Sequence, residues 1–153
     1  QNYISGDYSG KHPVARAFFE FCYPRFDHSL FELIKGYEQK AVRADFTIKH
    51  TINDQYIFAD TDISHITINE NFIIGHSHQA FEREKDGYKI VNTGSLGQNR
   101  QHINKSCYLM LDTESNAVEL KSFVNDVDMV IDQMRSEDYP PICIDYYLSK
   151  KRI

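Results

Sequence analysis

The sequence has few cysteines, no long apolar run and no basic cluster in its body, and each absence removes a class of protein. Its three cysteines, Cys22, Cys107 and Cys143, are odd in number and widely spaced, which predicts neither a disulfide framework nor a CxxC metal site. No apolar stretch approaches the ~20 residues that cross a bilayer. The N-terminal residues show no signal-peptide pattern. We therefore expect a cytoplasmic protein with no membrane partner.

Positive charge gathers only at the C-terminal Lys150, Lys151 and Arg152, and the formal net charge is −5. This distribution gives no electrostatic support for general binding to nucleic acid backbones. Apolar residues make up 41% of the chain and charged residues 25%, so the composition is that of an ordinary globular protein. The chain is long enough to bury the core of one compact domain.

The spacing of apolar residues in the N-terminal part of the chain is typical of helices. Apolar residues recur at helical spacing over 13–23 and again over 30–40, which predicts two helices. Ser29 followed by Glu32 has the form of a capping box at the start of the second helix. The spacing of apolar residues changes from helical to strand-like near residue 44, and we expect residues 1–44 to form a helical insertion or cap segment.

From Asp45 onward, short strand patterns alternate with helix patterns, and antiparallel hairpins follow. This order predicts an α/β fold in which helices cover a mixed sheet. The predicted strands are 45–50, 55–59, 71–75, 80–84, 88–92, 106–113 and 117–124. Three helices are predicted in the same part of the chain: a short one that begins near Thr61, one over 127–135 and one over 144–149.

Two histidines, His76 and His78, follow the strand that ends at Gly75. In an extended segment, residues two apart point to the same face, so both rings would be directed at one place. Glycine leaves room there for a metal, a ligand or another backbone. Neutral imidazole is a ligand for zinc, manganese, iron, cobalt and nickel. An H-x-H pair at a strand end is also typical of two surface histidines, and the spacing alone does not choose between them.

The neighbouring motifs resemble a known family. "GHSH" closing a strand, with "VNTGSLGQNR" further along, resembles the calcineurin-like metallophosphoesterases, in which Gly-His-(Thr or Ser)-His is followed by Asn-(Pro or Thr)-Gly-Ser and often Arg. "ADFTIKHT" resembles the family's earlier strand, which ends in a metal-binding histidine, here His50. "KSFVNDVDMVIDQMRSEDYP" resembles the closing strand and helix of small bacterial members. The resemblance covers roughly Asp45 to the end.

This resemblance implies the C-terminal half of a four-layer αββα sandwich, with a mixed sheet and flanking helices. It also implies a two-metal site that hydrolyses phosphomono- or diesters. His50 and His76 would bind one ion and His78 the other. Arg100 would contact the phosphate, because its planar fork suits an anion. The ions are expected to be Mn²⁺ or Fe²⁺, with Zn²⁺ and Ni²⁺ as alternatives. The residues of the turn that supports the site would be Gly75, Asn92, Gly94 and Ser95.

The chain departs from the family pattern in one large respect. It has no Asp-x-His strand end, Gly-Asp-x-x-Asp turn or Gly-Asn-His-(Asp or Glu) loop, which supply the bridging aspartate, the other oxygen ligands and the histidine that assists the leaving group. Two divalent ions need anionic ligands between them. We therefore expect residues 45–153 to be the C-terminal half of a phosphoesterase domain, with no catalytic residue of its own and no activity alone. Its partners would be a phosphate ester and the N-terminal half of the same enzyme.

Two other classes of function remain open. One is a non-catalytic, protein-binding scaffold on the same fold, because a fold does not fix its chemistry. The other is a single-metal or metal-free binding domain in which His76 and His78 are incidental. Two metal ions per full-length protein would favour the enzyme, and none would favour the scaffold.

Overall fold

The computed structural model describes residues 5–153, so the start of the predicted 1–44 segment, residues 1–4, lies outside the described residues. The chain forms two compact units. A helical unit contains the described residues up to Tyr37 together with Asp126–Lys150, and a sheet unit contains Glu38–Asn125 and Lys151–Ile153. Within the described residues, every helix is too short or too polar to cross a membrane.

The helical unit is built from short helices joined by aromatic contacts. The ring of Phe18 meets the rings of Tyr139 and Tyr147 edge-on, at centroid distances of 6.1 and 6.3 Å. The side chain of Asp126 caps the fourth α-helix by accepting from the backbone N–H groups of Asp128 and Met129. The elements are α2 (Pro13–Cys22), the 3₁₀ turns η1 (Tyr23–Arg25) and η2 (His28–Leu30), α3 (Phe31–Lys35), α4 (Val127–Ser136) and α5 (Pro141–Leu148).

The first predicted helix is confirmed, whereas the second is wrong in length and in its cap. Helix α3 ends at Lys35, where the N–H of Gly36 closes the last turn onto Glu32 O at 3.3 Å. The residue at the start of α3 is Leu30, which makes no side-chain cap hydrogen bond. Asp27 instead caps the preceding turn η2, where its carboxylate accepts from the N–H of Ser29 at 2.9 Å. Whether residues 1–44 are an insertion stays a prediction.

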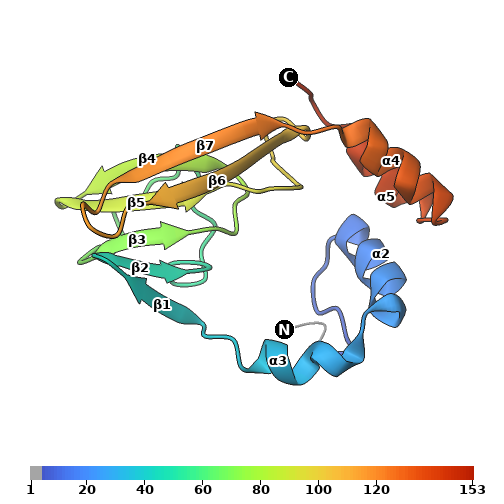
Figure 1. The fold of residues 1–153 in the computed structure, drawn as a ribbon, viewed down its shortest axis with the longest axis horizontal. Helices are drawn as coiled ribbons and strands as arrows, with labels where there is room; N and C mark the ends of the chain where they lie inside the picture. The colour runs from blue at the N-terminus through green and yellow to red at the C-terminus, as the bar shows by residue number, and fades with distance from the viewer. Residues whose placement is uncertain (1–4) are drawn as a thin grey trace. The chain divides into compact units, whose positions relative to one another are not determined.

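The sheet unit contains one mixed five-stranded sheet and one two-stranded hairpin (Figure 1). The order of the large sheet is β1-β2-β3-β5-β4, in which β2, β3 and β5 run parallel and the two outer strands pair antiparallel. This is the mixed α/β fold that the sequence predicts. The strands are β1 (Lys40–Arg43), β2 (Phe46–Lys49), β3 (Asn71–Ile74), β4 (Ala80–Lys85), β5 (Tyr88–Thr93), β6 (Lys105–Leu111) and β7 (Val118–Val124).

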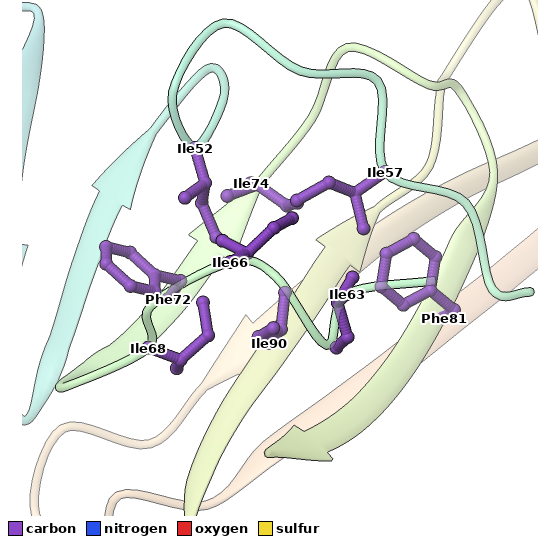
Figure 2. Close-up of a cluster of buried hydrophobic side chains, with 9 residues drawn as sticks. All are labelled: Ile52, Ile57, Ile63, Ile66, Ile68, Phe72, Ile74, Phe81 and Ile90. Atoms are coloured by element: carbon purple, nitrogen blue, oxygen red, sulfur yellow. The ribbon is translucent and has the colours of Figure 1, made fainter. Parts of the chain in front are cut away.

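Both faces of the large sheet are buried, which explains why its central strands are continuously apolar. Side chains alternate between faces along a strand. On one face Ile73 and Val91 join Phe46, and side chains of the β6–β7 hairpin pack against them. On the other face Phe72 and Ile90 lie under isoleucines of the 50–70 segment, as Figure 2 shows. The strands that carry the histidines at their ends are therefore held by packing on both faces of the sheet.

The segment between β2 and β3 is an irregular loop, so the predictions of a strand over 55–59 and a helix near Thr61 are wrong. The hydroxyl of Thr61 accepts from the N–H of Phe58 at 2.8 Å, and such local bonds compete with helix formation. The loop nevertheless packs tightly through isoleucines whose spacing fits neither a helix nor a strand: Ile52, Ile57, Ile63, Ile66 and Ile68. Burial, and not a backbone ladder, holds this segment on the sheet.

Two cations on β4 bind the backbone of this loop. The Lys85 ammonium donates to the carbonyls of Ile63 at 2.8 Å, of Ser64 at 2.9 Å and of Ile66. Arg83 Nη1 donates to Phe58 O at 3.2 Å and to Thr61 O at 2.6 Å. These bonds satisfy carbonyls that a helix would otherwise have paired.

We predict that Lys85→Met destabilises the fold by about 2–3 kcal/mol, because it leaves partly buried carbonyls without their charged donor. The Lys85 side chain is only 18% exposed. Urea unfolding followed by circular dichroism measures the loss, and hydrogen exchange should quicken in residues 58–66.

Lys89→Met is the matched control. Lys89 forms a half-exposed ion pair with Glu82, at 2.6 Å, so its loss should cost less than about 1 kcal/mol. Equal losses for the two variants would contradict the role given to Lys85.

Candidate metal centre

Two histidines meet at the carboxyl ends of neighbouring parallel strands. His50 follows β2 and His76 follows β3, and the N–H of Gly75 donates to His50 O at 3.2 Å. His50 Nε2 and His76 Nδ1 are 2.9 Å apart, and the two rings cross at 74°. Parallel pairing brings residues that lie 26 positions apart in the chain to one edge.

The backbone that carries His76 and His78 is not extended, so the strand geometry predicted for this motif is wrong. His76 has φ 67° and His78 has φ 56°, both in the left-handed region that side chains other than glycine rarely adopt. Ser77 between them is fully buried, and its N–H donates to Gly75 O at 2.8 Å. A compact turn therefore orients the two imidazoles, in a conformation that the surrounding structure has to stabilise.

Asn92 stabilises that turn from β5. Its side chain is fully buried, and Nδ2 donates to Gly75 O at 2.6 Å and to Ser77 Oγ at 3.0 Å. Its Oδ1 accepts from the N–H of Gly94 at 2.9 Å. One amide thus joins the histidine turn to the Asn-Thr-Gly-Ser turn.

Gly94 and Ser95 shape the second turn. Gly94 has φ +77°, and a Cβ there would lie 2.8 Å from the Cβ of Cys107, so this position has no room for a side chain. Ser95 Oγ accepts from the N–H of Gln98 at 3.0 Å. This bond fixes the segment that leads to Arg100.

His78 has a hydrogen bond that determines its tautomer. Its Nδ1 lies 3.1 Å from the carbonyl oxygen of Gln98. Because a carbonyl only accepts, Nδ1 carries the proton, and in the neutral ring Nε2 then has the lone pair for a ligand. Histidines that bind metals in proteins usually have their second nitrogen bonded in this way.

The surroundings of His76 favour the neutral form of its imidazole. Partial burial lowers the pKa of its imidazole, and the neighbouring His50, His78 and Arg100 lower this pKa further. Asp54 opposes the shift. Neutral imidazole is the ligand form, so this environment favours metal binding over protonation.

Two aromatic residues that the sequence interpretation assigned no role lie at the centre. The Tyr56 ring is 3.8 Å from the His76 ring, centroid to centroid, and Phe58 stacks beside Tyr56 at 6.3 Å. The Arg100 guanidinium lies 5.7 and 5.8 Å from the centroids of these two rings. The aromatic alternation of "QYIFA" predicts a strand, whereas the observed loop places the Tyr56 ring against His76 and both rings near Arg100.

The donor set fits part of a metal site. Two nitrogens bound at a right angle to one ion, at about 2.1 Å each, are about 3 Å apart, close to the 2.9 Å between His50 and His76. Over residues 5–153, however, no three histidine, cysteine, aspartate or glutamate side chains gather closely enough to hold an ion. The described chain therefore offers nitrogen donors without the carboxylates that a pair of divalent ions needs.

Comparisons with known proteins identify the family and the fold of the chain. The model of the calcineurin-like phosphoesterase superfamily domain matches residues 32–116. A hypothetical protein from Pyrococcus horikoshii OT3 superposes with a TM-score of 0.76 at 15% identity, over 95% of this chain and 63% of that one. A metallophosphoesterase from Sphaerobacter thermophilus superposes with a TM-score of 0.70 at 15% identity, over 97% of this chain and 72% of that one. No curated protein matches the sequence.

The family match includes His50, His76, His78 and Arg100, and it covers more than half of the chain. The two solved structures share its fold, and the chain spans less than two thirds of the Pyrococcus protein. The family typically binds divalent metals, in accord with the histidine donors. This chain therefore belongs to the calcineurin-like phosphoesterase superfamily.

Proposed function

We propose that the whole protein is a metal-dependent phosphoesterase that hydrolyses phosphomono- or diesters at a dinuclear centre. The observation that carries this proposal is the 2.9 Å approach of His50 Nε2 to His76 Nδ1 at the ends of two parallel strands, in a chain of this family. In the proposal, His50 and His76 bind one ion and His78 binds the other through Nε2.

The chain's own residues have separate tasks in this scheme. Bound divalent ions would supply Lewis-acid activation of the phosphate and a nucleophilic hydroxide near neutral pH. The histidines orient the ions, and the Asn92 amide holds the turn that carries two of the histidines. Arg100 donates hydrogen bonds to a phosphate oxygen, because its planar guanidinium presents two parallel N–H donors.

The oxygen ligands come, in this proposal, from an N-terminal half of the same enzyme, which acts as the partner of this chain. Two divalent charges without a bridging carboxylate repel each other, so the chain alone is inactive. Mn²⁺ or Fe²⁺ are the first choices, with Zn²⁺ and Ni²⁺ as alternatives. A cytoplasmic location fits the three free thiols. A non-catalytic, protein-binding scaffold on the same fold is the second candidate, because a fold does not fix its chemistry.

We predict that His50→Ala and His76→Ala each weaken binding of Co²⁺ to the chain by about 10–100-fold, because each removes one of two nitrogens that share an ion. The visible absorption of bound Co²⁺ reports the affinity. His65→Ala, an exposed histidine of the 50–70 loop, is the matched control and should leave the affinity unchanged. Equal affinity in all four proteins would reject the histidine centre.

We further predict that the chain alone, with saturating Mn²⁺, hydrolyses p-nitrophenyl phosphate and bis-p-nitrophenyl phosphate no faster than its His76→Ala variant. A longer form that carries the acidic motifs upstream should show hydrolysis that depends on Mn²⁺ and on His76. Turnover by residues 1–153 alone would contradict the proposed division of ligands, and an inactive, metal-free longer form would favour the scaffold.

A further inference from the structure

Tyr56 is an exposed aromatic residue held in a fixed place. Its side chain is 51% exposed, whereas the next residue, Ile57, is 1% exposed and anchors the loop in the core. One residue further, the carbonyl of Phe58 accepts from Arg83 of β4. The backbone on the C-terminal side of Tyr56 is thus pinned to the sheet, although the ring itself adds little to the core.

The ring of Tyr56 lies against His76. The centroid distance is 3.8 Å and the planes are inclined by 35°, so the contact is between ring faces. His76 stands on a left-handed turn, and its direction is not fixed by strand alternation. A ring in face contact restricts the rotation of the His76 imidazole and thereby keeps Nδ1 directed at His50.

The same ring also faces Arg100. The guanidinium lies within about 6 Å of the Tyr56 and Phe58 centroids, the range in which a cation is attracted by a ring face. Metal ions and protonated histidines repel a guanidinium, so Arg100 needs a local attraction to remain near them. The aromatic pair supplies it, and the N–H of Arg100, bonded to His78 O at 3.3 Å, fixes the other end.

We propose that Tyr56 is a positioning residue of the metal centre, which holds the His76 imidazole for the metal and the Arg100 guanidinium for the phosphate. This inference rests on the proposed function, because it assigns Tyr56 a task at that centre. It names a residue outside the histidine and Asn-Thr-Gly-Ser motifs, from a loop that the sequence pattern misassigns. The ring, and not the hydroxyl, performs the task, since both contacts are made by its face.

The first test compares Co²⁺ affinity in four forms of the chain. Tyr56→Ala and Tyr56→Leu should weaken binding by about 10-fold, the range found when a residue that supports a ligand is lost. Tyr56→Phe keeps the ring and should stay within about 2-fold of the wild type. Thermal unfolding of each variant verifies that the fold is intact, and Tyr56→Leu serves if Tyr56→Ala is unstable. Tyr37→Ala, at 59% exposure in the helical unit, is the control for loss of an exposed tyrosine.

The second test follows Arg100 with inorganic phosphate as the probe. Phosphate binding is read, at Co²⁺ concentrations that saturate every variant, from its effect on the Co²⁺ spectrum in wild type, Tyr56→Ala, Arg100→Gln and the double variant. If Tyr56 acts by holding Arg100, the double variant should bind phosphate no more weakly than Arg100→Gln alone. Additive losses would overturn this half of the proposal.

The outcomes separate the two proposals. If neither this chain nor the longer form with the acidic motifs binds Co²⁺, the proposed function fails and the role of Tyr56 fails with it. If only the longer form binds Co²⁺, the Tyr56 variants are compared in that form. If the wild type binds Co²⁺ and both Tyr56→Ala and Tyr56→Leu bind it equally well, only the role of Tyr56 is overturned. If Tyr56→Phe is as weak as Tyr56→Ala, the ring-face contact is not what positions His76.

Discussion

The buried amide of Asn92 is the interaction on which the candidate centre depends. It is the point where two turns from different strands are joined, through Gly75 O and Ser77 Oγ on one side and the N–H of Gly94 on the other. An amide in a fully buried position must have its donors and acceptor paired, and here both Nδ2 and Oδ1 are used. The strained histidine turn therefore owes its shape to a residue whose amide bonds Gly75, Ser77 and Gly94 and not the imidazoles.

The centre combines rigid and adjustable parts. Parallel pairing of β2 with β3 sets the distance between His50 and His76, whereas the left-handed turn and the contact with Gln98 set the direction of His78. Strand pairing is difficult to change by substitution, but a turn held by a few hydrogen bonds changes with its partners. The geometry of the candidate centre is thus more sensitive to the supporting turn residues than to the strands.

Most of the fold was predictable from the sequence, because strands with both faces buried carry dense apolar runs. Residues such as Phe72 and Ile73 pack on opposite faces of one strand, which accounts for the unbroken "NFII" pattern. The 50–70 loop was not predictable, since its isoleucines follow no regular period and its conformation depends on Lys85 and Arg83 from a later strand. The histidines were found by motif, but the turn that orients them depends on Asn92, Gly94 and the tertiary packing around Cys107.

Arg83 and Lys85 of β4 bind the 50–70 loop through its carbonyl oxygens, a group that every amino acid has. These hydrogen bonds do not depend on which side chains the loop residues carry, provided that the backbone follows the same path. Outward-facing positions of the loop that do not contact the histidines or Arg100 can consequently be substituted without loss of its shape. In this chain, that stretch is therefore a place where new surface chemistry can be introduced next to the pair of imidazoles.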